Sequence, residues 1–358
     1  MTIVRPRRPS RRVVIGGVAV GGGAPISVQS MTTTRTGDVG ATLGQIRRLE
    51  AVGCEIVRVA VPGAAAVEAL PAIVAGASIP VVADVHFDHR LALSALEAGV
   101  HGLRVNPGNI GGRDRAEQVA LAAKERGIPI RIGVNAGSLE KSILDRDGHP
   151  TAAGMVESAL AHLESLESVG FGDVVLSLKA SDPAMTIEAN RLVAERCDCP
   201  LHLGVTEAGT VLSGAVRSAT ALGVLLSDGI GDTIRVSLAG PPEEEIRVAR
   251  TILASLGLRR GGVTVVACPT CGRTEIDVAG IAEHIERETA GIRKTLLVAV
   301  MGCAVNGPGE AREADVGVAG GGDEAVLFRG GEVVEKVPQK DLLRRLIDEI
   351  EALVRDDT

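Results

Sequence analysis

The chain has 358 residues, which is long enough for one large or two smaller domains, and its hydrophobic content of 45% argues against disorder. Aromatic residues make up only 1% and the net charge is −7, so the composition argues against base stacking with nucleic acids and against general attraction to nucleic acids or anionic membranes. The apolar runs stay well short of the roughly 20 residues of a membrane span. We therefore expect a soluble, cytoplasmic protein whose cysteines stay reduced.

Up to residue 257, one pattern recurs: a short β-branched strand, one or two polar residues, and then an amphipathic helix. The eight predicted strands centre on residues 26–29, 56–60, 80–85, 102–106, 128–134, 173–178, 201–205 and 233–238. Eight such units in roughly 250 residues are typical of a TIM barrel. A doubly wound open sheet is the alternative, but no glycine fingerprint of a dinucleotide fold follows the first strand. We therefore predict a TIM (β/α)8 barrel over residues 1–257.

The pattern breaks near residues 259–262, and we predict a second domain over residues 258–358. This part has room for a strand before Cys268, a helix near 277–292 and a strand at 295–300. A hairpin turning at residues 330–331 and a final helix over 339–355 follow. The segment is too short for another barrel, so it is predicted to be a small α+β domain.

In a TIM barrel the active site lies at the carboxyl ends of the strands. Read in chain order, the predicted strand ends carry polar and charged side chains: Gln29, Ser30, Arg58, Asp84, His86, Arg104, Asn106, Arg131, Asn135, Lys179, Thr206, Glu207, Arg235 and Ser237. Five of these are cations from five different strands. Because the planar fork of arginine matches a phosphate, we predict that the barrel mouth binds a phosphate or diphosphate.

Three further interpretations concern single residues near this mouth. Glu207 is a candidate acid or base, with structural pairing to a neighbouring arginine as the alternative. Asp84 and His86 lie two residues apart and face the same side; since no third metal ligand is evident, we favour hydrogen bonding to a hydroxylated substrate. His202 falls near a strand start and is interpreted as structural. The polar segment 135–150 is either a lid over the mouth or a surface loop.

Three of the six cysteines precede predicted barrel strands: Cys54, Cys197 and Cys199. They are therefore expected at the amino-terminal end of the barrel, away from the active site. We interpret them as packing thiols.

The other three cysteines lie in the second domain. Cys268 and Cys271 have a spacing that by itself fits a zinc site, a redox dithiol or an iron–sulfur cluster. Cys303 follows another predicted strand, in a glycine-rich loop that ends at Glu310. No fourth Cys or His follows this loop in the domain, so the three cysteines fit structural zinc poorly. They fit a 4Fe-4S cluster with one exchangeable iron site, at which Glu310 can serve as a displaceable fourth ligand.

Seven segments carry a resemblance to a known family: 268–277 (CPTCGRTEID), 301–315 (MGCAVNGPGEAREAD), 27–34 (SVQSMTTT), 83–88 (ADVHFD), 104–109 (RVNPGN), 131–135 (RIGVN) and 204–209 (GVTEAG). They closely resemble the motifs of the 4-hydroxy-3-methylbut-2-enyl diphosphate synthases, which are iron–sulfur enzymes of the methylerythritol phosphate route to isoprenoids. The resemblance extends over essentially the whole chain in the compact two-domain bacterial form of the family.

The resemblance implies reductive ring opening of 2-C-methyl-D-erythritol 2,4-cyclodiphosphate to 4-hydroxy-3-methylbut-2-enyl diphosphate, with electrons from reduced flavodoxin or ferredoxin. It also implies a homodimer in which the cluster of one chain covers the barrel mouth of the other. Carried over residue by residue, the cluster ligands are Cys268, Cys271, Cys303 and Glu310. The diphosphate contacts are Arg58, Arg104, Arg131, Lys179 and Arg235, and the further polar contacts are Asp84, Asn106, Asn135 and Ser237. Glu207 and Glu310 take the catalytic roles.

Two other functions remain open at this point. The chain could be an iron–sulfur electron carrier or regulator without a substrate, or a zinc-stabilised barrel that binds another phosphorylated metabolite. Neutralising Arg104 and Arg131 separates the first from the enzyme, because a carrier should lose nothing. Metal analysis separates the second, because about four irons per chain exclude zinc.

Overall fold

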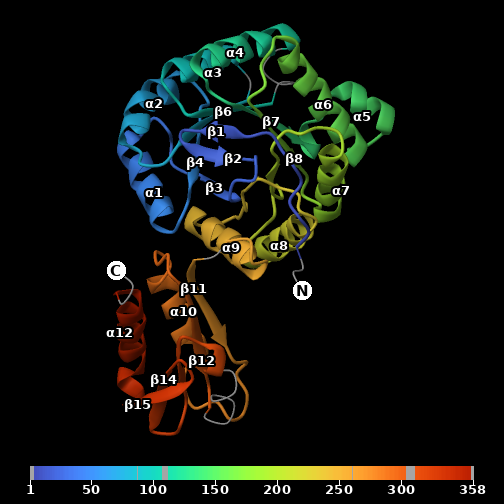
Figure 1. Cartoon of the computed structure of the whole chain (residues 1–358). Helices are drawn as coiled ribbons and strands as arrows, with labels where there is room; N and C mark the ends of the chain where they lie inside the picture. Colours follow the sequence, from blue (N-terminus) through green and yellow to red (C-terminus); the bar gives the residue numbers. More distant parts are fainter. Residues whose placement is uncertain (1–3, 87, 107–111, 260, 304–310, 356–358) are drawn as a thin grey trace. The chain divides into compact units, whose positions relative to one another are not determined.

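The structure is a computed structural model of the chain, and it describes residues 4–86, 88–106, 112–259, 261–303 and 311–355. The chain divides into two compact units, Met1–Arg259 and Arg260–Thr358. In the first, a ring of helices surrounds a set of strands, and the second is built on a sheet of its own (Figure 1).

The first unit contains an eight-stranded parallel sheet with the strand order β8-β7-β6-β5-β4-β3-β10-β9. Its strands are β3 (Ser27–Met31), β4 (Ile56–Ala60), β5 (Val81–Val85), β6 (Gly102–Val105), β7 (Ile130–Asn135), β8 (Val174–Lys179), β9 (His202–Leu203) and β10 (Thr233–Ile234). A bridge between Leu176 and Leu201 joins β8 to the segment that leads into β9. The sheet is therefore a nearly closed barrel, and the predicted TIM barrel is confirmed.

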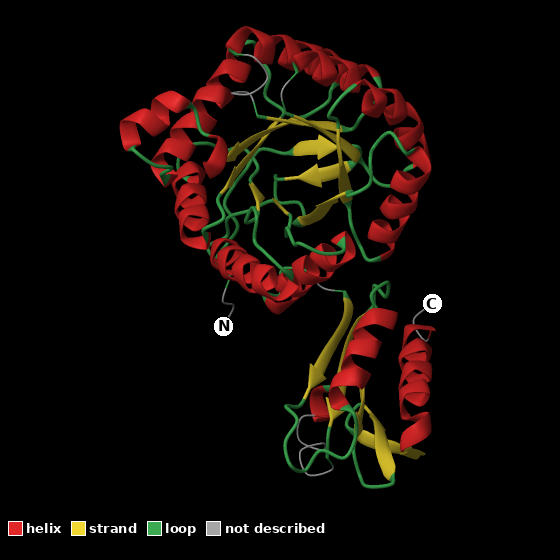
Figure 2. Cartoon of the chain, turned by 180° about the vertical axis from the view of Figure 1, so that it is seen from behind, coloured by secondary structure: helices red, strands yellow, loops and turns green. Residues whose placement is uncertain are grey.

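Helices cover the outside of the barrel, as Figure 2 shows in red. They are α1 (Val39–Ala51), α2 (Ala64–Gly76), α3 (His89–Glu97), α4 (Arg113–Arg126), α6 (Ala152–Ser168), α7 (Pro183–Ala194), α8 (Val211–Ser227) and α9 (Pro242–Ser255). Several begin at a capping side chain, for example Asp182, which accepts hydrogen bonds from the amides of Ala184 and Met185. The core between helices and strands is aliphatic, as expected for a chain almost without aromatic residues.

An N-terminal hairpin, which the sequence analysis did not predict, covers the amino-terminal end of the barrel. Its strands β1 (Val13–Ile15) and β2 (Val18–Val20) are antiparallel, and the turn between them consists of two glycines with φ of 52° and 95°. Ile15 and Val20 pack against Ile56 and Val82, which lie near the starts of β4 and β5. The hairpin closes this end, so a ligand must enter from the carboxyl ends of the strands.

Two predicted regions of the barrel differ in detail from the structure. Strands β9 and β10 have only two residues each, although the amide of Arg235 still donates to the carbonyl of Leu203 at 3.0 Å. The polar segment 135–150 is not an open loop, because it contains the 3-10 turn η1 (Ala136–Ser138) and the helix α5 (Lys141–Asp147). Its role as a lid stays a prediction.

The second unit contains a five-stranded sheet with the order β11-β12-β13-β14-β15, parallel over the first three strands and antiparallel over the rest. The strands are β11 (Gly262–Ala267), β12 (Thr295–Met301), β13 (Val316–Ala319), β14 (Glu324–Arg329) and β15 (Glu332–Pro338), with helices α10 (Val278–Glu288) and α12 (Leu342–Arg355) and the turns η2 (Ala311–Glu313) and η3 (Gln339–Asp341). Strand β13 was not predicted, whereas the hairpin turn at Gly330 and Gly331 was. The α+β architecture is confirmed. Among the described residues of the whole chain, we find no helix with the length and apolarity to span a bilayer.

Candidate active site

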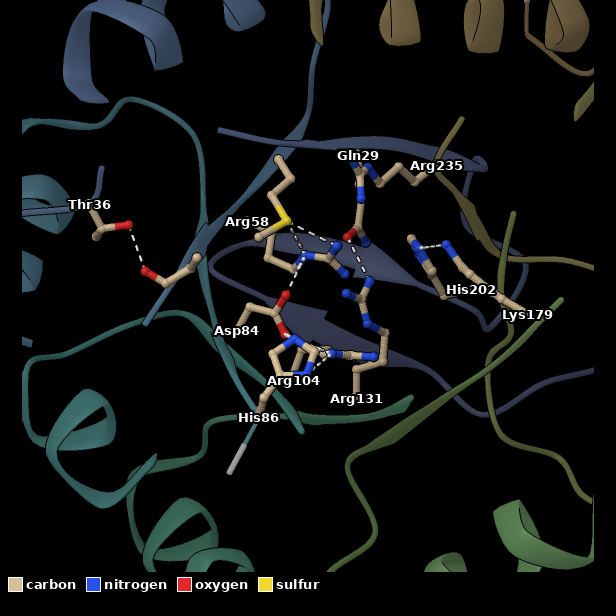
Figure 3. A network of polar contacts seen from close by, with 12 residues as sticks. Gln29, Thr36, Arg58, Asp84, His86, Arg104, Arg131, Lys179, His202 and Arg235 are labelled. Atoms are coloured by element: carbon tan, nitrogen blue, oxygen red, sulfur yellow. Dashed lines mark hydrogen bonds and ion pairs between the residues drawn. The ribbon is translucent and has the colours of Figure 1, made fainter. Parts of the chain in front are cut away.

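The strand register brings charged side chains to one level inside the barrel. Asp84 on β5 pairs with Arg104 on β6, which pairs with Arg131 on β7. These three residues and Lys179 are only 3–8% exposed. The sequence predicts the cations on a rim at the mouth, but Arg104, Arg131 and Lys179 are buried in the interior of the barrel. The site cations project toward one another there (Figure 3).

Asp84 lies between two arginines. Its carboxylate is 3.2 Å from Nε of Arg58 and accepts a hydrogen bond from Nη1 of Arg104 at 3.0 Å. Nη1 of Arg104 also lies 2.8 Å from Nε2 of His86, which is itself 3.4 Å from Asp84 (Figure 3). The two guanidinium groups are thus held at defined positions by one buried carboxylate.

Burial and the neighbouring positive charges shift the pKa of Asp84 in opposite directions. Burial alone would raise the pKa of Asp84, but Arg58, a hydrogen bond with His86 and Arg104 together outweigh burial and hold that pKa well below its ordinary value. Burial lowers the pKa of Arg58 to about 10, although Asp84 acts in the opposite sense. Asp84 is therefore ionised throughout the physiological range and serves as a fixed counter-charge rather than as a proton donor.

Arg131 and Lys179 have neutral partners instead of carboxylates. Nη1 of Arg131 donates to Oε1 of Gln29 at 3.2 Å, and Gln29 in turn donates to the hydroxyl of Thr233 at 2.8 Å. Nζ of Lys179 lies 3.2 Å from Nε2 of His202. The sequence analysis took His202 for a structural residue, yet its imidazole lies in the barrel interior against a site cation (Figure 3).

Glu245 contacts two of the predicted site residues, Arg235 and Ser30, and was not itself predicted. It lies in the first turn of α9 and is only 4% exposed. Its carboxylate pairs with Arg235 at 3.0 Å and accepts hydrogen bonds from the hydroxyl of Ser30 at 2.8 Å and the amide of Leu238 at 3.1 Å. Glu245 therefore orients Arg235 and also ties down the chain that follows β10.

The site holds more buried positive than negative charge. The five cations are Arg58, Arg104, Arg131, Lys179 and Arg235, and the carboxylates that pair with them are Asp84 and Glu245. Within the described part of the chain, neither Arg131 nor Lys179 has a carboxylate at ion-pair distance. Since unpaired buried charge is costly, this excess indicates a site for an anion with several negative charges.

Two glycines make room for the cations. A Cβ at Gly133 on β7 would lie 2.6 Å from Nε of Arg104. A Cβ at Gly204 would collide first with the backbone carbonyl oxygen of Arg235 and would also lie 2.8 Å from Nζ of Lys179. Both positions have ordinary backbone angles, so their importance lies in space rather than in conformation. The missing side chains leave space for Arg104 at Gly133, and at Gly204 for the neighbouring backbone and the Lys179 amine.

The other predicted site residues are near the carboxyl ends of the strands. Ser138 links two of them, because its hydroxyl accepts from Nδ2 of Asn106 at 3.2 Å and donates to the carbonyl of Asn135 at 3.3 Å. Ser237 is half-buried, two residues beyond Arg235. Ser138 was not predicted, although its place in a polar segment after a strand end was a signal for it.

Glu207 follows β9 and is exposed. Among the described residues other than glycine, Glu207 is the one with a left-handed backbone conformation, at a φ of 52°. Such a conformation costs about 1 kcal/mol and is concentrated at functional sites. The loop after β9 thus holds Glu207 at the open end of the barrel with a strained backbone conformation.

In the second unit, two of the predicted cluster cysteines follow adjacent parallel strands. Ala267 at the end of β11 pairs with Val300 on β12, so Cys268 and Cys303 lie beyond the same edge of the sheet. The amide of Gly302 donates to Sγ of Cys268 at 3.0 Å. Cys271 lies on the exposed turn that follows, where its amide donates to the hydroxyl of Thr274 at 3.0 Å.

The cluster site is described only in part. Glu310 lies outside the described residues, and among those that are described no three His, Cys, Asp or Glu side chains form a group that could hold a metal ion. The donor chemistry nevertheless fits an iron–sulfur cluster. Free thiols follow neighbouring strand ends, and an amide donates to sulfur, as is usual around cluster thiolates.

The three remaining cysteines are located as the sequence predicted. Cys54 and Cys199 are buried in the barrel core and Cys197 is half-buried, and all three precede strands. Burial raises the pKa of the Cys54 thiol to about 12, which makes that thiol unreactive.

Comparison with known proteins places this architecture in a family. Residues 10–250 match the GcpE TIM-barrel domain, and residues 264–352 match the GcpE protein C-terminal domain. The chain is 58% identical over 347 residues to a Geobacter sulfurreducens protein named 4-hydroxy-3-methylbut-2-en-1-yl diphosphate synthase (flavodoxin), covering 97% of this chain and 98% of that one. A Geobacillus thermodenitrificans protein of the same name is 54% identical over 356 residues, covering 99% and 95%.

Among solved structures, the barrel is similar to dihydropteroate synthase from Stenotrophomonas maltophilia, with a TM-score of 0.50 and 15% identity over 69% of this chain and 98% of that one. The 3-dehydroquinate dehydratase of Geobacillus kaustophilus gives a TM-score of 0.50 and 13% identity over 72% and 98%. At such low identity these likenesses concern the barrel fold alone. The two family domains and the full-length relatives show that the chain belongs to the GcpE family, that of the 4-hydroxy-3-methylbut-2-en-1-yl diphosphate synthases.

Proposed function

We propose that this chain opens the ring of 2-C-methyl-D-erythritol 2,4-cyclodiphosphate reductively to form 4-hydroxy-3-methylbut-2-enyl diphosphate, an isoprenoid precursor. The observation that carries the proposal is the excess of buried positive charge in a barrel whose other end is closed by a hairpin. Full-length relatives carry the name of the corresponding synthase. An electron carrier has no use for such a pocket, and the family does not support the carrier or zinc-barrel alternatives.

The substrate diphosphate would be bound in the barrel interior by Arg58, Arg104, Arg131, Lys179 and Arg235, with Asp84, Asn106, Asn135 and Ser237 as further polar contacts. As the ring opens, one end of the diphosphate becomes a free phosphate and gains negative charge. Cations already held in place by Asp84, Gln29 and Glu245 stabilise this charge without having to reorganise. This is how the network would favour the transition state over the bound ring.

Proton transfer is assigned to Glu207. Its carboxylate lies on a loop at the open end of the barrel, and its backbone is held in a left-handed conformation. An exposed carboxylate at this position can exchange protons with solvent and with a bound substrate hydroxyl, which leaves as water.

The cofactor would be a 4Fe-4S cluster bound by Cys268, Cys271 and Cys303, with Glu310 as the fourth, displaceable ligand. When bound, the cluster supplies electrons one at a time and one iron site open to exchange. The Gly302 amide, which donates to Sγ of Cys268, would stabilise the added negative charge on sulfur.

The electron donor would be reduced flavodoxin, as the names of the relatives indicate, or a ferredoxin. We also propose a homodimer in which each cluster serves the barrel of the partner. The cytoplasm is the expected compartment, because the six cysteines are free thiols and the cluster cysteines must stay reduced.

The test is anaerobic turnover of the cyclic diphosphate with a chemical reductant. We expect product formation by the wild-type protein and a loss of at least about 100-fold in kcat/KM for Arg131→Met, which removes a cation that has no carboxylate partner among the described residues. Arg113→Met, at an exposed i,i+4 pair on α4, is the matched control and should behave as the wild type. No turnover by wild-type protein that contains about four irons per chain would refute the proposed reaction.

A further inference from the structure

Lys179 is the lysine among the five site cations, and like Arg131 it has a neutral partner. Its side chain is 8% exposed, and its amine lies over the bare backbone of Gly204. The partner of Nζ is Nε2 of His202 at 3.2 Å, on the neighbouring strand β9. Arg58, Arg104 and Arg235 each contact a carboxylate, and guanidinium groups stay charged under nearly all conditions. An amine in the same place can lose its proton.

His202 cannot compensate for a charge on Lys179 and does not carry one itself. The imidazole is completely buried, and among the described residues its Nδ1 has no hydrogen-bond partner. A buried imidazolium would need acceptors for both N–H groups, so the ring is neutral and Nε2 is the acceptor for the lysine amine. Burial and the nearby cations hold the pKa of His202 well below its ordinary value, which is consistent with this assignment.

The groups that act on Lys179 come from all sides of the barrel. The cations are Arg131 on β7, Arg235 beyond β10, Arg58 on β4 and Arg104 on β6. The site carboxylates, Asp84 on β5 and Glu245 on α9, are already bound to arginines. Burial first, and these cations second, hold the pKa of the Lys179 amine well below its ordinary value. A dianion in the barrel would reverse the electrostatic part of this effect.

We propose that Lys179 takes up a proton from solution when a dianion enters the barrel, and that His202 is a positioning residue that keeps the amine aimed at the anion as a neutral acceptor. The inference rests on the proposed diphosphate site. Lys179 would be uncharged in the empty barrel and would become charged only when the dianion binds. The empty barrel would then avoid part of the repulsion among its cations.

The coupling has a definite sign. A ligand that raises the pKa of a group is bound together with protons, so its affinity falls as the pH rises through the range in which the free amine has lost its proton. For one proton, the limit of this fall is about tenfold in affinity per pH unit. Arginine in place of Lys179 would remain protonated and would remove the effect.

The experiment is calorimetric titration of the anaerobically purified holoprotein with sulfate. Sulfate is a dianion that does not itself titrate between about pH 6 and pH 9, unlike inorganic diphosphate. Repeating the titration in buffers with different ionisation enthalpies gives the number of protons taken up. We expect uptake that rises with pH toward about one proton per sulfate, together with a matching loss of affinity.

Four variants test whether Lys179 is the group that takes up the proton. Lys179→Arg should bind sulfate without proton uptake, and Lys179→Met should bind it more weakly and also without uptake. His202→Gln keeps a neutral acceptor that does not titrate, so uptake should persist. Lys124→Met, at an exposed lysine on α4, is the control and should match the wild type.

The outcomes separate the two proposals. Wild-type protein that binds sulfate with no proton uptake overturns the inference and leaves the diphosphate site intact. Uptake that persists in Lys179→Arg, or that disappears in His202→Gln, also overturns it, because the proton then belongs to another group. Absence of any sulfate binding by the wild type would overturn the anion site itself, and the inference with it.

Discussion

Asp84→Asn removes a buried carboxylate that compensates two arginines at once. The side chain is 2% exposed, and its ion pairs with Arg58 and Arg104 measure 3.2 and 3.0 Å. Removing one partner of a buried ion pair typically costs about 3–5 kcal/mol, since the remaining charge is left uncompensated. Here two guanidinium groups are left, in a site that already has excess positive charge. We therefore expect a loss in the upper part of that range in the free energy of unfolding of the barrel.

Far-UV circular dichroism in urea is a suitable assay, because the chain contains no Trp or Tyr for fluorescence. Hydrogen exchange of peptides from β4 to β6 then assigns the loss to the barrel rather than to the second unit. Asp198→Asn is the matched control: it breaks an exposed pair with Arg11 and should cost at most about 1 kcal/mol. Sulfate should restore part of the stability lost by Asp84→Asn, because it supplies negative charge to the same arginines. The reasoning would be refuted if both variants lost the same small amount and sulfate had no effect.

Two other variants test how the cations are held. Gly133→Ala places a methyl group 2.6 Å from the unmodified position of Nε of Arg104, so we expect that guanidinium to shift and sulfate affinity to fall about tenfold in calorimetric titration. Unchanged affinity would show that the space at Gly133 is not needed, and Gly223→Ala, where a Cβ meets nothing within 4 Å, is the control. Glu245→Gln should raise KM for the cyclic diphosphate by about tenfold or more, because Arg235 loses its ion-pair partner. A change in kcat alone would contradict a role of Glu245 in positioning Arg235.

Much of the barrel was predictable from local sequence, because each unit carries its own signals. The β-branched strand cores, the capping residues and the glycines at helix ends act over a few residues, and strand β4 begins and ends where it was predicted. The hairpin β1–β2 and strand β13 were missed. Strands β1 and β2 have three residues each and β13 has four, so their hydrophobic pattern is too short to distinguish a strand from a loop.

The sequence by itself determined the family, the two-domain architecture and the identity of the charged residues at the strand ends, because motifs and periodicity are local properties of the chain. Only the tertiary structure decided how deep those charges lie and what holds them. Glu245 on α9 contacts Ser30, which lies 215 residues earlier in the chain, and Lys179 on β8 contacts His202 on the neighbouring strand β9. Such contacts depend on the closure of the barrel, which local sequence does not encode. Closure also brings the cations at the strand ends into a cluster in which, among the described residues, cations outnumber carboxylates. That imbalance is the physical basis for an anion site.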